Sequence, residues 1–469
     1  MLKPATKKAE NNSILAGWGG TAVDSLSTMI LMGLQDSPQY HRAVEHSRRI
    51  DFTRTHEGAD QEGEPRVGVV SIFETTIRYI GGLLSAYQLG GERAQDRFMV
   101  QQMQTLADGL SFGWDKGHRI PFNYVQINAT PPRPDDSSDT ANLAEAGSLL
   151  LEWHSLSQYS QNSTYGALAM QSMRAIMESK GAFPGLFPQN IWPGNESYKD
   201  DYHTYGGGTD SFYEYLVKYP YLIGEGPNSD FYKLYEQSMD SVQKHLVSKS
   251  GLNGIVFLTD YSEKVANGTI NIFSHLACFA GGNMAMAGRL LKRDEWTTLG
   301  LQLAESCARV QLGTSLKIAP SAWGWYDGDK QAKGWTYVST PRRLHYNKEG
   351  FFVTNTDWVN RPEILESVFY AYRITGQQFW RDYAWTFFQQ WKQYCDTGSG
   401  WAGIVNVNDD STGLYDSQQT FLFAETFKYL YLIFDDPDAF SLDEYVLTTE
   451  GHPFKVKPNP EFGKIQGTL

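Results

Sequence analysis

The amino-acid sequence predicts an all-α protein whose helices form a toroid around a common axis, and three observations carry this prediction. Long segments repeat apolar residues at i, i+3, i+4 and i+7, the period of an α-helix with a buried face. Alternating patterns typical of strands are scarce. An acidic residue recurs near the start of successive helices, roughly every 60 residues.

Five segments define the clearest expected helices in chain order. Residues 74–89, 142–160 and 210–222 lie in the first half of the chain, and residues 362–376 and 420–434 lie near its end. Several are apolar nearly all round, so we expect both faces to pack against neighbouring helices. One helical hairpin per repeat would stack such helices around an axis, as repeat architectures do.

The recurring acids mark one end of these helices. They are Asp24, Glu74, Glu145, Asp210, Glu363 and Glu425. Successive members of the first four are separated by 50, 71 and 65 residues, and the last two are separated by 62 residues. An acid near a helix N-terminus gains about 0.3–1 kcal/mol from the helix dipole, so each acid alone has a structural explanation. Because Arg78, His275 and Arg361 recur beside them, the set predicts a carboxylate-lined pocket at one mouth of the toroid.

The composition restricts the class of protein. A formal net charge of −13 without any Lys/Arg cluster argues against a nucleic-acid partner. No apolar stretch approaches the roughly 20 residues that cross a bilayer, and no signal peptide is visible at the start of the chain. No linker or charge block divides the 469 residues, so one large domain, expected to be a monomer, is favoured over two.

Several stretches, taken together, resemble a known family. They are GWGGTAVDSL, FETTIRYIGGLLSAY, LAEAGSLLLEW, GGGTDSFYEYLVK, HLACFAGG, RPEILESVFYAYRITG, FAETFKYLYLIF and TTEGHP, in family order from about residue 17 to 454. The pattern is similar to glycoside hydrolase family 47, the class I α-1,2-mannosidases, and resembles its fungal secreted and Golgi-type subgroup. The resemblance implies an (α/α)7 barrel at residues 17–455, between an N-terminal tail (1–16) and a C-terminal tail (456–469).

The resemblance also implies an activity and its catalytic residues. The chain is expected to be an inverting mannosyl-oligosaccharide 1,2-α-mannosidase that removes terminal mannose from high-mannose N-glycans. Glu74 matches the general acid, Glu363 the base and Asp210 the third catalytic carboxylate, although the assignment within this trio stays open. Inverting enzymes need one carboxyl group to protonate the leaving oxygen and a second to activate water.

A bound Ca²⁺ is the implied cofactor. Thr449 matches its protein ligand, while Glu363, Glu425 and Glu450 resemble an outer shell that orders the metal's waters. The residues that match substrate contacts are Arg78, Glu145, His275, Arg361, Glu366, Phe421 and Glu425. Arg361 is expected to keep a neighbouring carboxylate charged. Alternatively, Arg361 and Glu366 form a buried ion pair with only a structural role. His275 could likewise be a core residue whose ring nitrogens are hydrogen-bonded within the protein.

The cysteines and sequons bear on the compartment. The three cysteines leave room for one bridge and one free thiol; the resemblance implies a Cys278–Cys307 disulfide with Cys395 free. Five N-x-S/T sequons, more than chance predicts, favour a glycoprotein of the secretory pathway; they begin at Asn11, Asn128, Asn162, Asn195 and Asn267. The resemblance implies the Golgi or endoplasmic-reticulum lumen, or the cell exterior, and the sequons agree with this location.

The sequence departs from the family pattern in three places. Only 16 residues precede Gly17, so the barrel could lack its first helix, from a truncated N-terminus, and expose apolar surface in the gap. Gln419 and Thr420 replace an acid–serine pair. Gly208 stands where the endoplasmic-reticulum trimming subgroup carries arginine, which would open the pocket to several glycan branches.

Two other classes of protein compete with the enzyme. A mannose-binding quality-control homologue could keep the barrel and hydrolyse little, but Glu74, Asp210, Glu363 and Thr449 are all present. A purely structural toroid would not explain why acids and arginines recur at one mouth. The partner that the resemblance implies is a mannosyl-oligosaccharide.

Overall fold

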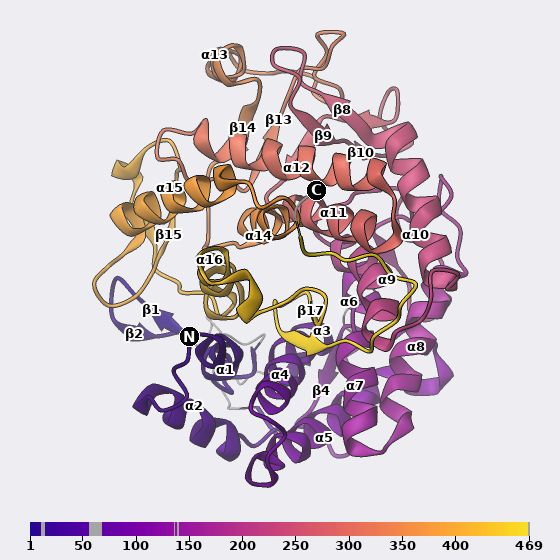
Figure 1. The fold of residues 1–469 in the computed structure, drawn as a ribbon. Coiled ribbons are helices and arrows are strands. Elements are labelled where there is room, and N and C mark those ends of the chain that lie inside the picture. The colour runs from indigo at the N-terminus through magenta and orange to yellow at the C-terminus, as the bar shows by residue number, and fades with distance from the viewer. Residues whose placement is uncertain (11–14, 56–67, 136, 138–139, 468–469) are drawn as a thin grey trace.

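The structure, a computed structural model, describes residues 1–10, 15–55, 68–135, 137 and 140–467. Within these ranges, seven helical segments surround the axis of a ring, as Figure 1 shows. In chain order they are α1 (Gly20–Leu31); α3 (Ile72–Thr75), η2 (Thr76–Ile80) and α4 (Gly81–Leu89); α6 (Leu143–Gly147) and α7 (Leu150–Ser160); α9 (Asp210–Ile223); η6 (Leu276–Cys278) and α11 (Phe279–Leu291); α14 (Glu363–Thr375); and η8 (Leu422–Thr426) with α16 (Phe427–Phe434).

Six further helices pack outside this inner ring. They are α2 (Pro38–Arg49), α5 (Phe98–Leu110), α8 (Ser163–Met177), α10 (Asp230–Ser241) with η5 (Val242–Leu246), α12 (Asp294–Leu312) and α15 (Gln378–Cys395). Helix α13 (Thr340–Glu349) lies farther out and has no buried residue. Short 3₁₀ turns complete the helical set: η3 (Ala94–Asp96), η4 (Ser111–Gly117), η7 (Asp410–Thr412) and η9 (Pro437–Ala439). The expected all-α toroid is confirmed.

The strands are short, antiparallel and confined to the connections. Their sheets are β1 (Leu2–Lys3) with β2 (Lys8–Ala9); β3 (Val69–Ser71), β4 (Tyr124–Gln126) and β5 (Arg133–Pro134); β6 (Ala141–Asn142) with β7 (Asn190–Ile191); β8 (Val247–Lys249) with β9 (Val256–Leu258); β10 (Asp260–Tyr261) with β11 (Thr269–Ile270); β12 (Ile272–Ser274), β13 (Ala322–Gly324) and β14 (Phe352–Asn355); β15 (Gly403–Ile404) with β16 (Leu414–Tyr415); and β17 (Tyr445–Leu447) with β18 (Pro453–Lys455). The β17–β18 hairpin lies inside the ring of helices (Figure 1).

The inner helices are buried on nearly every side, as their apolar sequences predict. In α9 every residue from Ser211 to Leu222 is buried, and α11 and α14 are almost as enclosed. Two of these helices end at a glycine in the left-handed conformation, Gly224 (φ 69°) and Gly376 (φ 65°), which satisfies the last carbonyls of the helix. The five predicted helical segments all contain helix, and 142–160 is divided near Ser148.

A disulfide and a free thiol occur where they were expected. Cys278, at the start of α11, is bonded to Cys307 of α12, and Cys395 is free and buried at the end of α15. Of the sequon asparagines, Asn162 caps α8, whereas Asn11 lies outside the described residues. Across the ranges given above, no helix is both long enough and apolar enough to cross a membrane.

Among the described residues, no outer helix covers the junction between α1 and the segment formed by η8 and α16. Helix α1 packs against η8 there, while α2 packs against α1 and α15 against α16, on either side of the junction. A groove of about 950 Å³ opens there, lined by apolar side chains that include Met29, Phe423 and Phe427. Met32 and Leu34 at its edge are each 40% exposed, and the β1–β2 hairpin lies in the interval between α15 and α2 (Figure 1). The described chain therefore has an apolar groove at this junction, whereas the expectation of a missing first helix stays a prediction.

Candidate functional site

A cavity of about 380 Å³ lies at the mouth of the ring where the inner helices begin. Eleven of the predicted site residues line it: Glu74, Arg78, Glu145, Asp210, Arg361, Glu363, Glu366, Phe421, Glu425, Thr449 and Glu450. His275 is the predicted residue that does not line it. The recurring acids of the sequence thus converge on one cavity, apart from Asp24, which lies behind the wall.

Glu363 is the first residue of α14 and its carboxylate is held from two sides. His275 Nδ1 donates to Glu363 Oε2 at 2.7 Å, and Arg361 Nη1 lies 3.8 Å from Glu363 Oε1. Burial alone would raise the pKa of Glu363, but the hydrogen bond and charge of His275, with the charge of Arg361, lower it below its usual range. The carboxylate is therefore kept ionised, as a base that activates water must be.

His275 itself is almost fully buried behind Glu363, with 2% of its surface exposed. Its position is that of a support for the carboxylate. We predicted that His275 contacts substrate directly, but its side chain is not among those that line the cavity. Sequence reasoning could not separate these roles, because the same buried ring can face a ligand or a neighbouring side chain.

Asp210 begins α9 on another side of the cavity. The backbone N–H of Ser211 donates to Asp210 Oδ1 at 2.9 Å. Burial, together with the charges of Glu214 and Glu363, raises the pKa of Asp210 to about 7, although the Ser211 bond and Arg361 oppose this shift. The cavity therefore holds one carboxyl group that keeps its proton near neutral pH beside another that does not.

Arg78 connects the acids of the opposite wall. It lies in the π-helical turn η2, and its Nε and Nη2 donate to Glu74 Oε2 at 2.9 and 2.7 Å. Its Nη1 donates to Glu450 and, at 3.0 Å, to Thr420 Oγ1. The guanidinium also lies 5.8 Å from the centre of the Phe421 ring. Thr420 thus supplies a hydrogen-bond acceptor at a position where the sequence departs from the family pattern.

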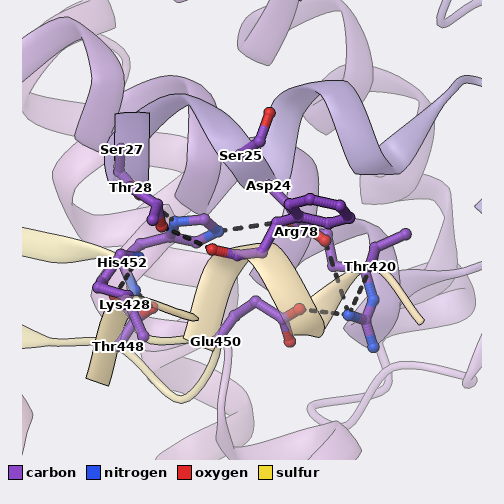
Figure 2. Close-up of polar contacts among 12 residues, drawn as sticks. Asp24, Ser25, Ser27, Thr28, Arg78, Thr420, Lys428, Thr448, Glu450 and His452 are labelled. Carbon is purple, nitrogen blue, oxygen red and sulfur yellow. Dashed lines mark hydrogen bonds and ion pairs between the residues drawn. The ribbon is translucent and has the colours of Figure 1, made fainter. Parts of the chain in front are cut away.

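A buried polar network lies behind this wall. Figure 2 shows Asp24 of α1 between His452 and Arg78, and Asp24 and Glu450 both face Nη1 of the guanidinium. His452 Nδ1 lies 3.1 Å from Ser27 Oγ, and its Nε2 lies 3.5 Å from Asp24 Oδ1. Burial lowers the pKa of His452 to about 4 even though Asp24 opposes the shift. The network joins α1 to the loop that follows β17.

Lys428 anchors the same loop from α16. Its Nζ donates to the Gly451 carbonyl at 2.6 Å, and its side chain is fully buried (Figure 2). Burial lowers the pKa of Lys428 to about 7, against the raising effect of Glu425, Asp24 and Glu450. Sequence reasoning missed Lys428 and His452. A lone lysine inside the apolar segment 420–434 was the available signal for the first.

Glu366 takes part in a second buried pair. Lys218 of α9 bonds to Glu214 and lies 3.8 Å from Glu366 Oε1, so Glu366 pairs with Lys218, whereas Arg361 pairs with Glu363. Burial raises the pKa of Glu366 well above its usual range despite the charge of Lys218. The alternative of a simple Arg361–Glu366 pair does not describe the geometry.

Glu145 caps a helix and also lines the cavity. It forms a capping box at the start of α6, in which Asn142 Oδ1 accepts from Glu145 N at 2.9 Å and Glu145 Oε2 accepts from Asn142 N at 3.2 Å. Asn123 Nδ2 donates to the same carboxylate. Burial raises the pKa of Glu145. Helix capping therefore fixes its carboxylate at the edge of the cavity.

The loop between β17 and β18 fits a hard cation. Thr449 lines the cavity, and its hydroxyl has no hydrogen-bond partner among the described side chains and backbone. Burial raises the pKa of both Glu425 and Glu450 well above their usual range; the charge of Glu450 adds to the shift of Glu425, and the charges of Asp24 and Glu74 add to that of Glu450. A bound cation would relieve this repulsion. No set of three His, Cys, Asp or Glu side chains in the described chain forms a ligand cluster, so waters would complete the shell.

Gly208 has a backbone that favours glycine. Its φ is +89°, and a Cβ atom there would lie 2.6 Å from Gln189 Nε2. Gln189 Nε2 also donates to the Gly207 carbonyl at 2.6 Å. An arginine at this position would therefore strain the turn as well as fill the pocket.

The chain resembles known proteins along nearly its whole length. The model of the family described as Glycosyl hydrolase family 47 matches residues 1–456. A mannosyl-oligosaccharide alpha-1,2-mannosidase from Coccidioides posadasii is 36% identical over 462 residues, which cover 94% of this chain and 83% of the relative. A probable mannosyl-oligosaccharide alpha-1,2-mannosidase 1B from Aspergillus flavus is 34% identical over 460 residues, or 94% and 84% of the two chains. The solved structure of an alpha-1,2-mannosidase from Trichoderma reesei, 32% identical, superposes with a TM-score of 0.88 over 97% of this chain and 94% of that chain.

Proposed function

Because the chain belongs to glycosyl hydrolase family 47 and is an α-1,2-mannosidase, we propose that it removes terminal mannose from high-mannose N-glycans by an inverting, Ca²⁺-dependent reaction. The observation that carries this proposal is the cavity in which Glu74, Asp210 and Glu363 meet. Inverting hydrolysis needs one carboxyl group that can give a proton and one carboxylate that can take one from water.

Glu363 is the proposed base. Its lowered pKa keeps it ionised, and His275 and Arg361 fix its orientation at the start of α14. In this role it accepts a proton from the water that attacks the anomeric carbon.

The proton for the leaving oxygen comes from Glu74 or Asp210. Glu74 is the proposed acid by its match to the family motif, and its carboxylate accepts two hydrogen bonds from Arg78 that fix its position. Asp210, with a pKa of about 7, can hold a proton near neutral pH. These two observations support a shared role in which Asp210 stores the proton and Glu74 directs its delivery, directly or through water.

Thr449 is the proposed protein ligand of Ca²⁺, with Glu363, Glu425 and Glu450 around it. When bound, the metal would hold the hydroxyls of the terminal mannose and favour distortion of its ring. The aromatic ring of Phe421 would pack against the apolar face of the sugar. The polar contacts are assigned to Arg78, Glu145, Arg361, Glu366 and Glu425, which line the same cavity.

The proposed setting is an oxidising compartment. The Cys278–Cys307 disulfide supports the lumen of the secretory pathway or the cell exterior. We expect the protein to act as a monomer on free or protein-linked glycans.

One incubation tests the proposal. The purified protein is mixed with a nine-mannose glycan, with and without prior EDTA treatment and dialysis, and the products are followed by mass spectrometry. We expect stepwise loss of mannose that chelation abolishes and added Ca²⁺ restores. Activity that survives exhaustive chelation would remove the calcium role, and absence of any mannose release would favour the non-hydrolytic, mannose-binding alternative.

A further inference from the structure

A second hollow lies at the end of the ring opposite the cavity described above. Its volume is about 500 Å³, and the two spaces share no lining residue. Its walls are the last turns of α4, α7 and α9 together with the open end of the β17–β18 hairpin. Strand β17 packs against α9 and β18 against α4 (Figure 1). The hollow is therefore separate from the proposed catalytic residues.

Two lysines of the hairpin form one wall of this hollow. Lys455 and Lys457 both line it and are exposed, whereas Val456 between them is buried. The backbone N–H of Val456 donates to the Glu444 carbonyl at 2.9 Å, so the segment stays extended and the two lysines leave it on the same side. Within the described chain, neither ammonium group is paired with a carboxylate. This wall is thus positive in a protein whose net charge is −13.

Helix α7 supplies a second wall with two unused polar atoms. Ser155 lines the hollow and is only 4% exposed, and within the described chain its hydroxyl makes no hydrogen bond. Gln158 Nε2 lies 2.9 Å from His154 Nε2, which leaves the Gln158 amide oxygen free to accept. A hydroxyl left unpaired at this depth is unfavourable. A ligand in the hollow would give it a partner.

The remaining groups define the charge of the hollow. Burial and the charge of Lys457 lower the pKa of His154, so the ring stays neutral at pH 7. Glu92 at the rim accepts a hydrogen bond from Tyr159 Oη at 2.6 Å, and its second carboxylate oxygen is free. Two ammonium groups therefore face one carboxylate, and the lining keeps a net positive charge.

These walls select a ligand that is both anionic and rich in hydroxyl groups. A bare anion would meet Glu92 and the negative ends of three helix dipoles, and a phosphate ion alone is too small to fill the space. A neutral sugar or a zwitterion would leave net positive charge uncompensated. In a phosphorylated sugar, the phosphate can accept from the lysines and Ser155, while the sugar hydroxyls donate to Gln158 and Glu92.

We propose that this hollow is a binding site for a phosphorylated sugar, with Lys455, Lys457 and Ser155 holding the phosphate and Gln158 and Glu92 holding the sugar. Lysines near helix C-termini also complement the helix dipoles, but that role would not explain the unpaired hydroxyl of Ser155. The site goes beyond the proposed function, since its binding does not require that the protein cleave any glycan.

Calorimetric titration of the full chain tests the site. The probes are glucose 6-phosphate, inorganic phosphate and glucose, and we expect affinity to fall in that order. Lys457→Ala should weaken the binding of glucose 6-phosphate about 10-fold, the scale of a lost charge-assisted hydrogen bond. Ser155→Ala should weaken it about 3–10-fold, the scale of a neutral one. In NMR titrations the ligand should raise the pKa of His154, because the phosphate offsets the charge of Lys457.

Lys464→Ala is the matched control. Lys464 is an exposed lysine that does not line the hollow, so its variant should bind glucose 6-phosphate as the parent does. Parental affinity in both Lys457→Ala and Ser155→Ala, or an unchanged pKa of His154 on binding, would overturn the site. Inorganic phosphate that binds as tightly as glucose 6-phosphate would overturn the contacts to the sugar. Absence of binding at about 10 mM ligand would overturn the proposal altogether.

Discussion

Glu363, the proposed base, shows how neighbours tune one residue. Burial would ordinarily raise the pKa of its carboxyl group, and the hydrogen bond and charge of His275, with the charge of Arg361, reverse that tendency. The motif around Pro362 predicts the base from the sequence. It does not predict that His275 lies behind the carboxylate, because that contact joins residues 88 positions apart.

Replacing either proposed catalytic glutamate tests its role. Glu363→Gln and Glu74→Gln should each lower kcat at least about 100-fold, the scale of lost acid–base catalysis. The circular dichroism spectrum should stay that of the parent. Glu305→Gln, on the exposed side of α12, is the matched control and should keep full turnover. Near-parental kcat in either test variant would exclude that residue from the mechanism.

Glu152 gives a pH dependence of stability. It is fully buried, its Oε1 accepts from Tyr215 at 2.8 Å, and its Oε2 has no partner within the described chain. Burial, opposed by the Tyr215 bond, raises its pKa to about 8. Between these two pKa values the folded state keeps a proton on Glu152 that the unfolded chain releases. The stabilisation that Glu152 contributes is therefore fully present below the pKa of an ordinary glutamate and is lost as the pH rises through about 8.

The variant Glu152→Gln cannot lose that proton. Its Tm should match the parent's near pH 5 and exceed it by about 2 °C or more near pH 8. Scanning calorimetry at the two pH values measures the difference, with Glu305→Gln again as the exposed control. An equal difference at both pH values would contradict the buried, protonated state of Glu152.

At the scale of elements, two inner helices contain a π-helical turn, and both turns carry site residues. Arg78 lies in η2, and Glu425 lies in η8. Such turns widen a helix locally and often occur at functional sites. The helical repeat of apolar residues predicts both helices. No signal in the sequence marks the residues at which the α-helical hydrogen-bond pattern gives way to a π-helical turn. The β17–β18 hairpin is also beyond the reach of periodicity, because its position depends on the ring that surrounds it.

The hairpin loop offers a test at this scale. Lys428→Met removes the donor to the Gly451 carbonyl while keeping a side chain of similar length in the buried space. The loop that carries Thr449 should loosen, so the Ca²⁺ concentration that half-restores activity after chelation should rise about 10-fold or more. Turnover at saturating Ca²⁺ should fall much less.

Lys455→Met provides the comparison on the same hairpin. Lys455 is exposed on β18, so its variant should need no more Ca²⁺ than the parent. A Lys428→Met protein with parental calcium dependence would show that the loop is held by its other contacts, such as the bond from Thr449 N to Tyr215 Oη.

At the scale of the whole molecule, the sequence predicts the class and the cavity but not the buried network. Helical period and recurring acids are local signals, and they place Glu74, Asp210 and Glu363 at one mouth. Lys218 and Lys428 look like interruptions of apolar helices in the sequence, because Lys218 lies near Glu366 of α14 and Lys428 donates to the Gly451 carbonyl, both in other segments. Such long-range polar contacts are fixed by the closed ring, so a linear pattern cannot contain them.

The junction between α1 and the η8–α16 segment, which no described outer helix covers, makes resistance to opening differ around the ring. Where an outer helix packs on two inner helices, separating the inner pair exposes apolar surface on three helices. At this junction, separating the inner pair exposes apolar surface on only two. Regions with fewer buried contacts open first, so thermal opening should begin at this junction. Here α1 carries Asp24 behind the wall of the cavity, and η8 carries Glu425, which lines it. The catalytic end of the molecule would then lose its geometry while the opposite side of the ring, between α9 and α11, is still closed.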